Sequence, residues 1–181
     1  MDFSFTKAQE KFRLDVRGFL QNEEKKSLLK KRSNYFLEVS DQTFSKKLVK
    51  NGWMCLTWPK KYGGAGKSYV DRAVLMEELL KFNAPLLYHM LGERQIGPAL
   101  LHYGSDDLKN EFLPKISNAD ISMCVGISEP DSGSDVGSIS TTAVKDGDYY
   151  IINGQKIWTT NAHNADYIWL VVNTDPDLQA H

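Results

Sequence analysis

The chain has 181 residues, of which 41% are hydrophobic and 25% charged, the composition of a soluble globular protein with one or two domains. It carries 22 basic and 23 acidic residues, so no basic excess is present to neutralise phosphates and no nucleic-acid partner is expected. The amino-terminal region is polar and charged, and no apolar run is long enough to cross a bilayer. The sequence therefore predicts no signal peptide, no membrane span and a cytoplasmic location.

The first half of the chain has helical patterns. Thr6 and Gln9 have the spacing of a capping box, in which each side chain bonds a free backbone amide at the start of a helix. A weaker helical pattern runs over residues 36–50. Pro59 and a glycine pair then interrupt the pattern, so residues 52–64, with two tryptophans and a tyrosine, are expected to form a packed loop.

Three further helices are expected before residue 120. The apolar spacing predicts one over residues 70–82 and another over residues 86–103. Pro98 would kink the second helix unless it marks a helix start. Ser105 is placed to cap a short last helix that has Pro114 near its end.

After Asp120 the pattern changes to short alternating segments that are typical of strands. Two hairpin-turn dipeptides, Asp146-Gly147 and Asn153-Gly154, lie among them. We expect strands near residues 121–125, 140–144, 149–152, 156–160 and 167–172. The predicted fold class is α+β: an amino-terminal all-α helical domain over residues 1–120, then an incomplete antiparallel β domain over residues 121–181.

The segment after the first expected strand is rich in small and hydroxyl residues, reading CVGISEPDSGSDVG over positions 124–137. Such a turn exposes backbone amides and hydroxyls, and a glycine allows a ligand to come close. It would suit a phosphate or the polar edge of a flavin ring. Taken alone it is more typical of an ordinary turn.

A second segment reads NGQKIWTTN over positions 153–161. Trp158 could pack in the core, which is the usual place for a tryptophan on a strand. It could also stack on an aromatic ligand, with Thr159 and Thr160 giving hydrogen bonds. Taken alone, the segment favours core packing.

Together the two segments resemble the acyl-CoA dehydrogenase family. Residues 127–130 (ISEP) with 133–135 (GSD) are similar to that family's signature, and residues 153–160 (NGQKIWTT) to its second flavin segment. The similarity also takes in residues 58–64, 93–98, 113–116 and 165–177, and so covers nearly the whole chain. Two long motifs in the expected order and spacing are a specific signal.

The resemblance implies an FAD site on the β domain. Its expected cofactor-binding residues are Val125, Ile127, Ser128, Gly133, Ser134, Trp158, Thr159 and Thr160. By the same resemblance, Ser128 would bond the flavin ring and Trp158 would pack on it. Thr160 would reach its hydride-accepting side. Ser134 would also contact the CoA portion of the substrate.

The implied activity is the α,β-dehydrogenation of an acyl-CoA thioester, with an electron-transfer flavoprotein as the expected electron acceptor. The family's catalytic base is a glutamate in a carboxy-terminal helical domain, which is expected to lie outside this chain. No catalytic residue is therefore assigned, and the chain alone is not expected to be active. Glu129 lies inside the signature, but the resemblance gives it a structural role.

Other interpretations keep the predicted fold but give the chain a different function. The chain could be a non-catalytic subunit of a hetero-oligomeric acyl-CoA dehydrogenase, or part of an acyl-CoA oxidase or flavin monooxygenase. A homo- or hetero-oligomer is expected for the complete protein. The four histidines lack metal-ligand spacing, so no metal site is expected. Cys55 and Cys124 fit no disulfide framework and are expected to be reduced.

Overall fold

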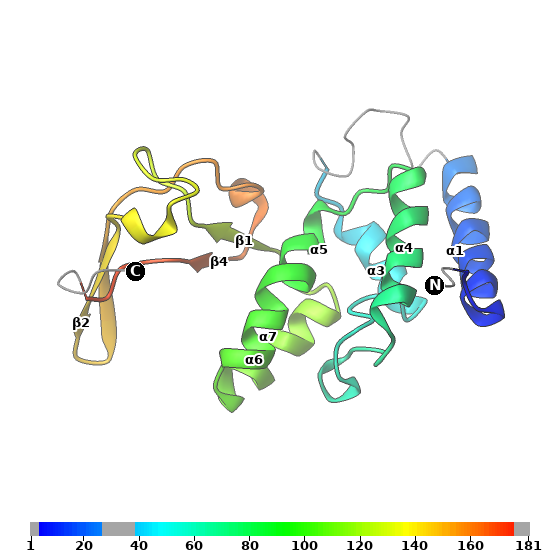
Figure 1. Ribbon diagram of the computed structural model, residues 1–181, viewed down its shortest axis with the longest axis horizontal. Helices are drawn as coiled ribbons and strands as arrows, with labels where there is room; N and C mark the ends of the chain where they lie inside the picture. The colour runs from blue at the N-terminus through cyan, green and yellow to red at the C-terminus, as the bar shows by residue number, and fades with distance from the viewer. Residues whose placement is uncertain (1–3, 27–38, 176–181) are drawn as a thin grey trace. The chain divides into compact units, whose positions relative to one another are not determined.

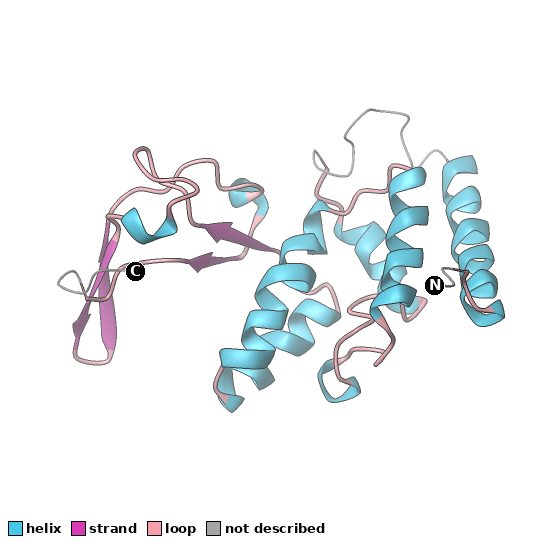
Figure 2. Ribbon diagram, viewed as in Figure 1, coloured by secondary structure: helices cyan, strands magenta, loops and turns pink. Residues whose placement is uncertain are grey.

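The computed structural model describes residues 4–26 and 39–175 (Figure 1). The chain divides into two compact units, residues 1–122 and 123–181. Among the described residues, the long helices lie in the first unit and all the strands lie in the second (Figure 2). This confirms the expected order of a helical region followed by a strand-bearing region. The two units are described separately.

The helical unit opens with α1, Lys7–Lys25, and the predicted capping box is confirmed. The hydroxyl of Thr6 accepts from the amide of Gln9, while the Gln9 side chain accepts from the Thr6 amide. The next helix, α3, spans Gln42–Lys50 and begins later than its sequence pattern. The side chain of Asp41 caps its first turn. Residues 36–38 of the expected helix lie outside the described residues.

The expected packed loop is present between α3 and the next helix and contains one short 3-10 turn, Lys60–Tyr62. Trp58 is the residue that packs it, since only 2% of its surface is exposed. Gly97 lies against the Trp58 indole so closely that an added Cβ would come within 1.9 Å of the ring. Gly64 similarly approaches the Trp58 carbonyl. The indole therefore fills space that only glycines leave open.

Helix α4, Tyr69–Lys81, is close to its predicted bounds and starts at a capping box made by Ser68 and Asp71. The predicted helix over residues 86–103 is formed in three parts. These are α5, Leu87–Leu91, a π-helical turn, Gly92–Ile96, and α6, Gly97–Tyr103. Pro98 lies in the first turn of α6, and the wider π turn before it suits a residue that has no amide hydrogen to donate. Pro98 thus marks a helix start.

The last helix, α7, spans Asp106–Ser117 and is capped by Ser105 as predicted. Helices α1 and α4 lie side by side, and α7 packs against α6 (Figure 1). The core between the helices is aliphatic. Its most buried side chains are Val16, Leu20, Leu48, Val74, Leu79, Leu86, Ile96, Leu113 and Ile116.

An ion-pair cluster joins α1 to α4. The carboxylate of Glu78 is buried, and Arg17 donates to both of its oxygens, from Nε at 2.8 Å and from Nη2 at 2.7 Å. Arg13 donates to Glu77 at 2.6 Å and to Glu78 at 3.3 Å. The two-point contact fixes the orientation of the guanidinium as well as its distance. The hydrogen bond from Arg17 lowers the pKa of Glu78 although burial raises it.

We expect the Glu78→Gln substitution to lower the free energy of unfolding of the helical unit by about 2 kcal/mol. It removes a buried negative charge while both arginines remain, and the partial exposure of Arg17 limits the loss. Urea denaturation followed by far-UV circular dichroism measures the effect. The neighbouring Glu77→Gln is the control, because the Glu77 side chain is 56% exposed and should change stability by less than about 0.5 kcal/mol. Equal losses in the two variants would contradict this account.

The strand-bearing unit contains two small sheets. Strands β2, Thr142–Asp146, and β3, Tyr149–Asn153, form an antiparallel hairpin, and Gly147 in its turn has φ +59°. Strands β1, Met123–Gly126, and β4, Tyr167–Leu170, pair with Val125 opposite Trp169. This second pair is parallel, whereas the antiparallel expectation holds for β2 and β3. A turn dipeptide predicts that the two strands flanking it form a hairpin. It carries no information on strands such as β1 and β4, which pair although a long stretch of chain separates them.

The predicted strand over residues 156–160 is wrong. These residues form no strand, and Trp158 and Asn161 have φ values of +56° and +68°, which a strand does not contain. Asn153-Gly154 ends β3 but starts no hairpin. An added Cβ at Gly154 would lie 2.6 Å from Cα of Thr141, so this glycine serves a close backbone approach.

Candidate flavin site

The signature segment leaves β1 and folds into a self-contained loop. The backbone groups of Glu129 and Ser132 bond each other, with the Glu129 amide 2.7 Å from the Ser132 carbonyl. The Ser132 hydroxyl donates to the Asp135 carbonyl at 2.7 Å, and the Ser138 hydroxyl donates to that of Ser132. These hydrogen bonds from the serine hydroxyls fix the conformation of the loop, so it is not a flexible turn.

The expected cofactor residues of this segment differ in exposure. Val125 lies in β1, and Ile127 and Ser128 follow it, all three half-buried. Gly133 and Ser134 are exposed, and a Cβ built on Gly133 would meet nothing within 4 Å. The outer part of the loop is therefore open to a ligand, while its inner part is fixed against the sheet.

The second segment carries the most exposed large apolar side chain of the described residues. Trp158 is 85% exposed, so the core-packing alternative does not hold within its unit. Its φ of +56° is unusual for a bulky residue, and such conformations gather at ligand sites. Thr159 is half-buried and Thr160 is exposed, while Asn161 is buried in a left-handed conformation.

The structure brings the inner ends of the two segments together. The amide of Ile157 donates to the carbonyl of Ser128 at 2.9 Å. The ammonium of Lys156 donates to the carbonyl of Ile127, also at 2.9 Å. Residues 127–128 and 156–157 are therefore neighbours although they are far apart in the sequence. Ser128 is thus bonded to the residue directly before Trp158, and Ile127 to the residue before that.

The ammonium of Lys156 and Oε1 of Glu129 form a buried ion pair at 2.7 Å, which links the two segments. Oε1 of Glu129 also accepts from the Thr141 amide at 2.9 Å, and Oε2 accepts from the Ser140 amide and hydroxyl at 2.6 and 2.7 Å. Burial would raise the pKa of Glu129, but the hydrogen bonds from Lys156, Thr141 and Ser140 outweigh it and hold the pKa well below its usual range. A carboxylate so engaged is a poor proton acceptor, which supports a structural role.

Sequence reasoning gave Lys156 no role, although it lies inside the second motif. A signal was present, because the charged residues of the signature segment are all acidic, whereas Lys156 is the only charged residue of the second segment. Their pairing could not be derived, since nothing in the spacing shows that residues 129 and 156 meet. Thr141 was missed as well. It is buried, and its hydroxyl oxygen has no hydrogen-bond partner among the described residues.

The residues present fit a flavin. A planar aromatic ring needs an apolar surface to lie on, and Trp158 offers one that no described residue covers. The polar ring edge and a pyrophosphate need donors, and Ser128, Ser134 and Thr160 carry hydroxyls on or next to the two bonded segments. Gly133 leaves space for close approach. These features together match an amphipathic ligand with one flat face and one polar edge.

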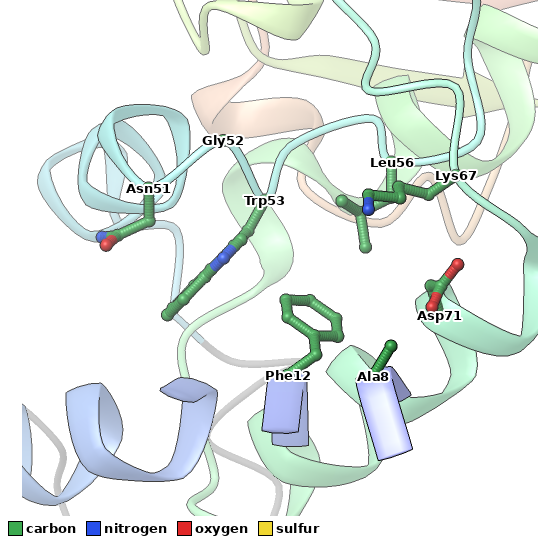
Figure 3. Close-up of a pocket in the computed structure, with 8 residues that line it drawn as sticks. All are labelled: Ala8, Phe12, Asn51, Gly52, Trp53, Leu56, Lys67 and Asp71. Atoms are coloured by element: carbon green, nitrogen blue, oxygen red, sulfur yellow. The ribbon is translucent and has the colours of Figure 1, made fainter. Parts of the chain in front are cut away.

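The helical unit has a pocket of its own, a cavity of about 250 Å³. Trp53, Phe12 and Leu56 surround it, with Lys67 and Asp71 at its edge (Figure 3). The carboxylate of Asp71 already accepts the amide and hydroxyl of Ser68 in the α4 capping box. None of the residues that the motifs single out lies in this pocket.

Residues 4–26 and 39–175 contain no group of three or more potential metal-ligating side chains. Within the same ranges, no helix has both the length and the apolar character that crossing a membrane requires.

Comparison with known proteins gives a consistent result. The family described as "Acyl-CoA dehydrogenase, N-terminal domain" matches residues 6–120, and "Acyl-CoA dehydrogenase, middle domain" matches residues 124–181. The chain is similar to acyl-CoA dehydrogenase FadE26 of Mycobacterium tuberculosis, with 36% identity over 98% of this chain and 45% of the relative. It thus spans about half the length of that protein.

Solved structures agree with the sequence comparison. The structure titled "Tcur3481-Tcur3483 steroid ACAD" superposes with a TM-score of 0.83 and 34% identity, over 100% of this chain and 47% of that one. The ChsE4-ChsE5 complex from Mycobacterium tuberculosis gives a TM-score of 0.81 and 37% identity, over 97% and 44%. Both likenesses extend over the helical and the strand-bearing regions.

Proposed function

This chain belongs to the acyl-CoA dehydrogenase family, a family of FAD-dependent oxidoreductases, and we propose that it binds FAD and takes part in the α,β-dehydrogenation of an acyl-CoA thioester. The observation that carries the proposal is the exposed, conformationally strained Trp158 beside the bonded signature segment. An exposed indole held in a costly conformation needs a ligand to explain it.

The two segments divide the binding of the cofactor between them. Backbone and hydroxyl groups from Val125 to Ser128 would hold the polar edge of the ring, and Trp158 would pack on its face. Thr159 and Thr160 would bond its rim. Gly133 and Ser134 would receive the pyrophosphate, and Ser134 would also contact the CoA portion of the substrate. FAD, when bound, would supply the hydride acceptor for the reaction, and an electron-transfer flavoprotein would take up the electrons.

Proton abstraction falls to another group. Glu129 lies inside the signature, yet four hydrogen bonds occupy its two oxygens. We assign it no role as a base, and we place the catalytic carboxylate outside residues 123–175. The site residues of this chain therefore bind and orient the reactants and do not move the proton.

The Trp158→Ala substitution tests the site. It should weaken FAD binding by about tenfold, because the ring loses the surface that it lies on. Titration of the protein with FAD, followed by quenching of flavin fluorescence, gives the dissociation constant. Trp158→Phe keeps an aromatic face and should recover most of the affinity. If Trp158→Ala binds FAD as tightly as the unchanged protein, the assignment of Trp158 is wrong.

A second candidate function is that of one subunit in a hetero-oligomeric acyl-CoA dehydrogenase. Two structures at TM-scores above 0.8 favour it, since both titles name a pair of proteins. It predicts that a related chain co-purifies with this one from the source organism and that FAD stays with the complex. Recovery of this chain with FAD and without any second chain would contradict it. Fast reaction of the reduced protein with oxygen would instead indicate an acyl-CoA oxidase.

A further inference from the structure

The Glu129–Lys156 pair differs from the other ion pairs of the described residues. It is the only one in which both side chains are less than a tenth exposed, at 2% for Glu129 and 7% for Lys156. In the Arg17–Glu78 pair, by comparison, the arginine is 33% exposed. Two buried charges lose their hydration, so apolar side chains of similar size often give equal or greater stability. A gain in stability alone is therefore a weak explanation for the presence of this buried ion pair.

The pair joins three stretches of chain that are separate in the sequence. Glu129 accepts from Ser140 and Thr141 at the entrance to β2, and from Lys156 in the second segment. Lys156 in turn donates to the Ile127 carbonyl, two residues before Glu129. Every hydrogen bond of the Lys156 ammonium therefore goes to the signature segment. With the bond from Ile157 to Ser128, the pair fixes the register between the two segments.

We propose that Glu129 and Lys156 are positioning residues that set the distance between the ring-edge groups of residues 125–128 and the ring-face residues 158–160. This rests on the proposed FAD site. A flavin ring whose edge is bound by one segment and whose face is bound by the other requires the two segments at a fixed distance from each other. An error of about 1 Å in that distance weakens the contacts with the ring. Neither charge is placed to touch the cofactor, since both side chains are less than a tenth exposed.

Three variants test the proposal in the complete protein, produced from its own gene with any associated subunits. Glu129→Gln leaves the Lys156 ammonium buried and unpaired. Lys156→Met leaves the carboxylate without its counter-charge. The double variant Glu129→Gln/Lys156→Met removes both charges with little change in volume, so its thermal midpoint should recover toward that of the unchanged protein. The measurements are the thermal midpoint, the FAD dissociation constant and the visible absorption band of bound flavin.

We expect all three variants to bind FAD about tenfold or more weakly, the loss that corresponds to one charge-assisted hydrogen bond, and to shift the flavin band. The double variant is decisive, because it separates stability from positioning. Glu78→Gln is the matched control: it also removes a buried, paired carboxylate, but it lies on α4 in the helical unit, whereas both segments belong to the strand-bearing unit. It should lower the thermal midpoint and leave FAD affinity within about twofold.

Two results would overturn the proposal. One is a double variant that binds FAD within about twofold of the unchanged protein, with the same flavin band. The other is a loss of FAD affinity in Glu78→Gln equal to that in Glu129→Gln, which would show that affinity follows general stability. Failure of the proposed function looks different, since the unchanged protein would then bind no FAD.

Discussion

Replacing Trp58 with alanine is expected to lower the free energy of unfolding of the helical unit by about 3–5 kcal/mol. The indole is 2% exposed and lies where Gly97 leaves room for it. The backbone at Trp58 is held by hydrogen bonds from the Gly66 amide to the Trp58 carbonyl and from the Trp58 amide to the Cys55 carbonyl, which limits collapse into the space. The loss should therefore include a cavity as well as the missing apolar contacts.

Trp158→Ala is the matched control for this prediction. It makes the same chemical change at a side chain that is 85% exposed, and it should alter stability by no more than about 0.5 kcal/mol. Urea denaturation of the two variants, followed by far-UV circular dichroism, gives both values. If the two substitutions lower the free energy of unfolding by the same amount, the packing of Trp58 does not stabilise the loop as described.

Acidification from pH 7 to about pH 4 is expected to remove about 3 kcal/mol of stability through His89 alone. His89 is buried, and burial lowers its pKa from 6.5 to about 4. Between these values the unfolded chain binds a proton at this site and the folded chain does not. Stability from His89 is thus complete above about pH 6.5 and is lost as the pH falls toward 4.

Burial is the cause of the lowered pKa of His89, and its hydrogen-bond contacts define its tautomer. Its Nδ1 lies 2.8 Å from the hydroxyl of Ser45, and that hydroxyl donates to the Asp41 carbonyl at 2.9 Å. A hydroxyl has one hydrogen, so Ser45 accepts from His89, which therefore carries its proton on Nδ1. No carboxylate is placed among these contacts to stabilise the imidazolium.

His89→Leu isolates this contribution. Its Ser45 hydroxyl keeps the bond to Asp41, so the substitution leaves no unpaired donor. The stability difference between the unchanged protein and the variant should shrink by about 3 kcal/mol between pH 7 and pH 4. Denaturation curves at a series of pH values measure it. Parallel stability curves for the two proteins would show that His89 titrates normally.

Local signals in the sequence predicted much of the helical unit. The Thr6 capping box and the Ser105 cap are short-range features, and both are present as expected. The π-helical turn before Pro98 was not predictable, because the helical pattern on either side of it is continuous. The start of α3 at Gln42 depended on the Asp41 cap, which the apolar pattern alone does not show.

The strand-bearing unit was harder to predict, since its structure depends on contacts between distant residues. The β2–β3 hairpin followed from Asp146-Gly147, whereas the parallel pairing of β1 with β4 had no local signal. Residues 156–160 have the composition of a strand, yet the left-handed conformation of Trp158 excludes one. The motifs identified the segments that come together, but the ion pair between Glu129 and Lys156 is evident only from the structure.

The most direct test of the proposed function is an anaerobic titration with acyl-CoA thioesters of the protein isolated from its source organism. An antibody against this chain would capture it with any associated subunits. We predict that the isolated protein contains bound FAD and that an acyl-CoA bleaches the visible flavin band. A protein that carries no FAD, or one whose FAD no acyl-CoA reduces, would contradict the account.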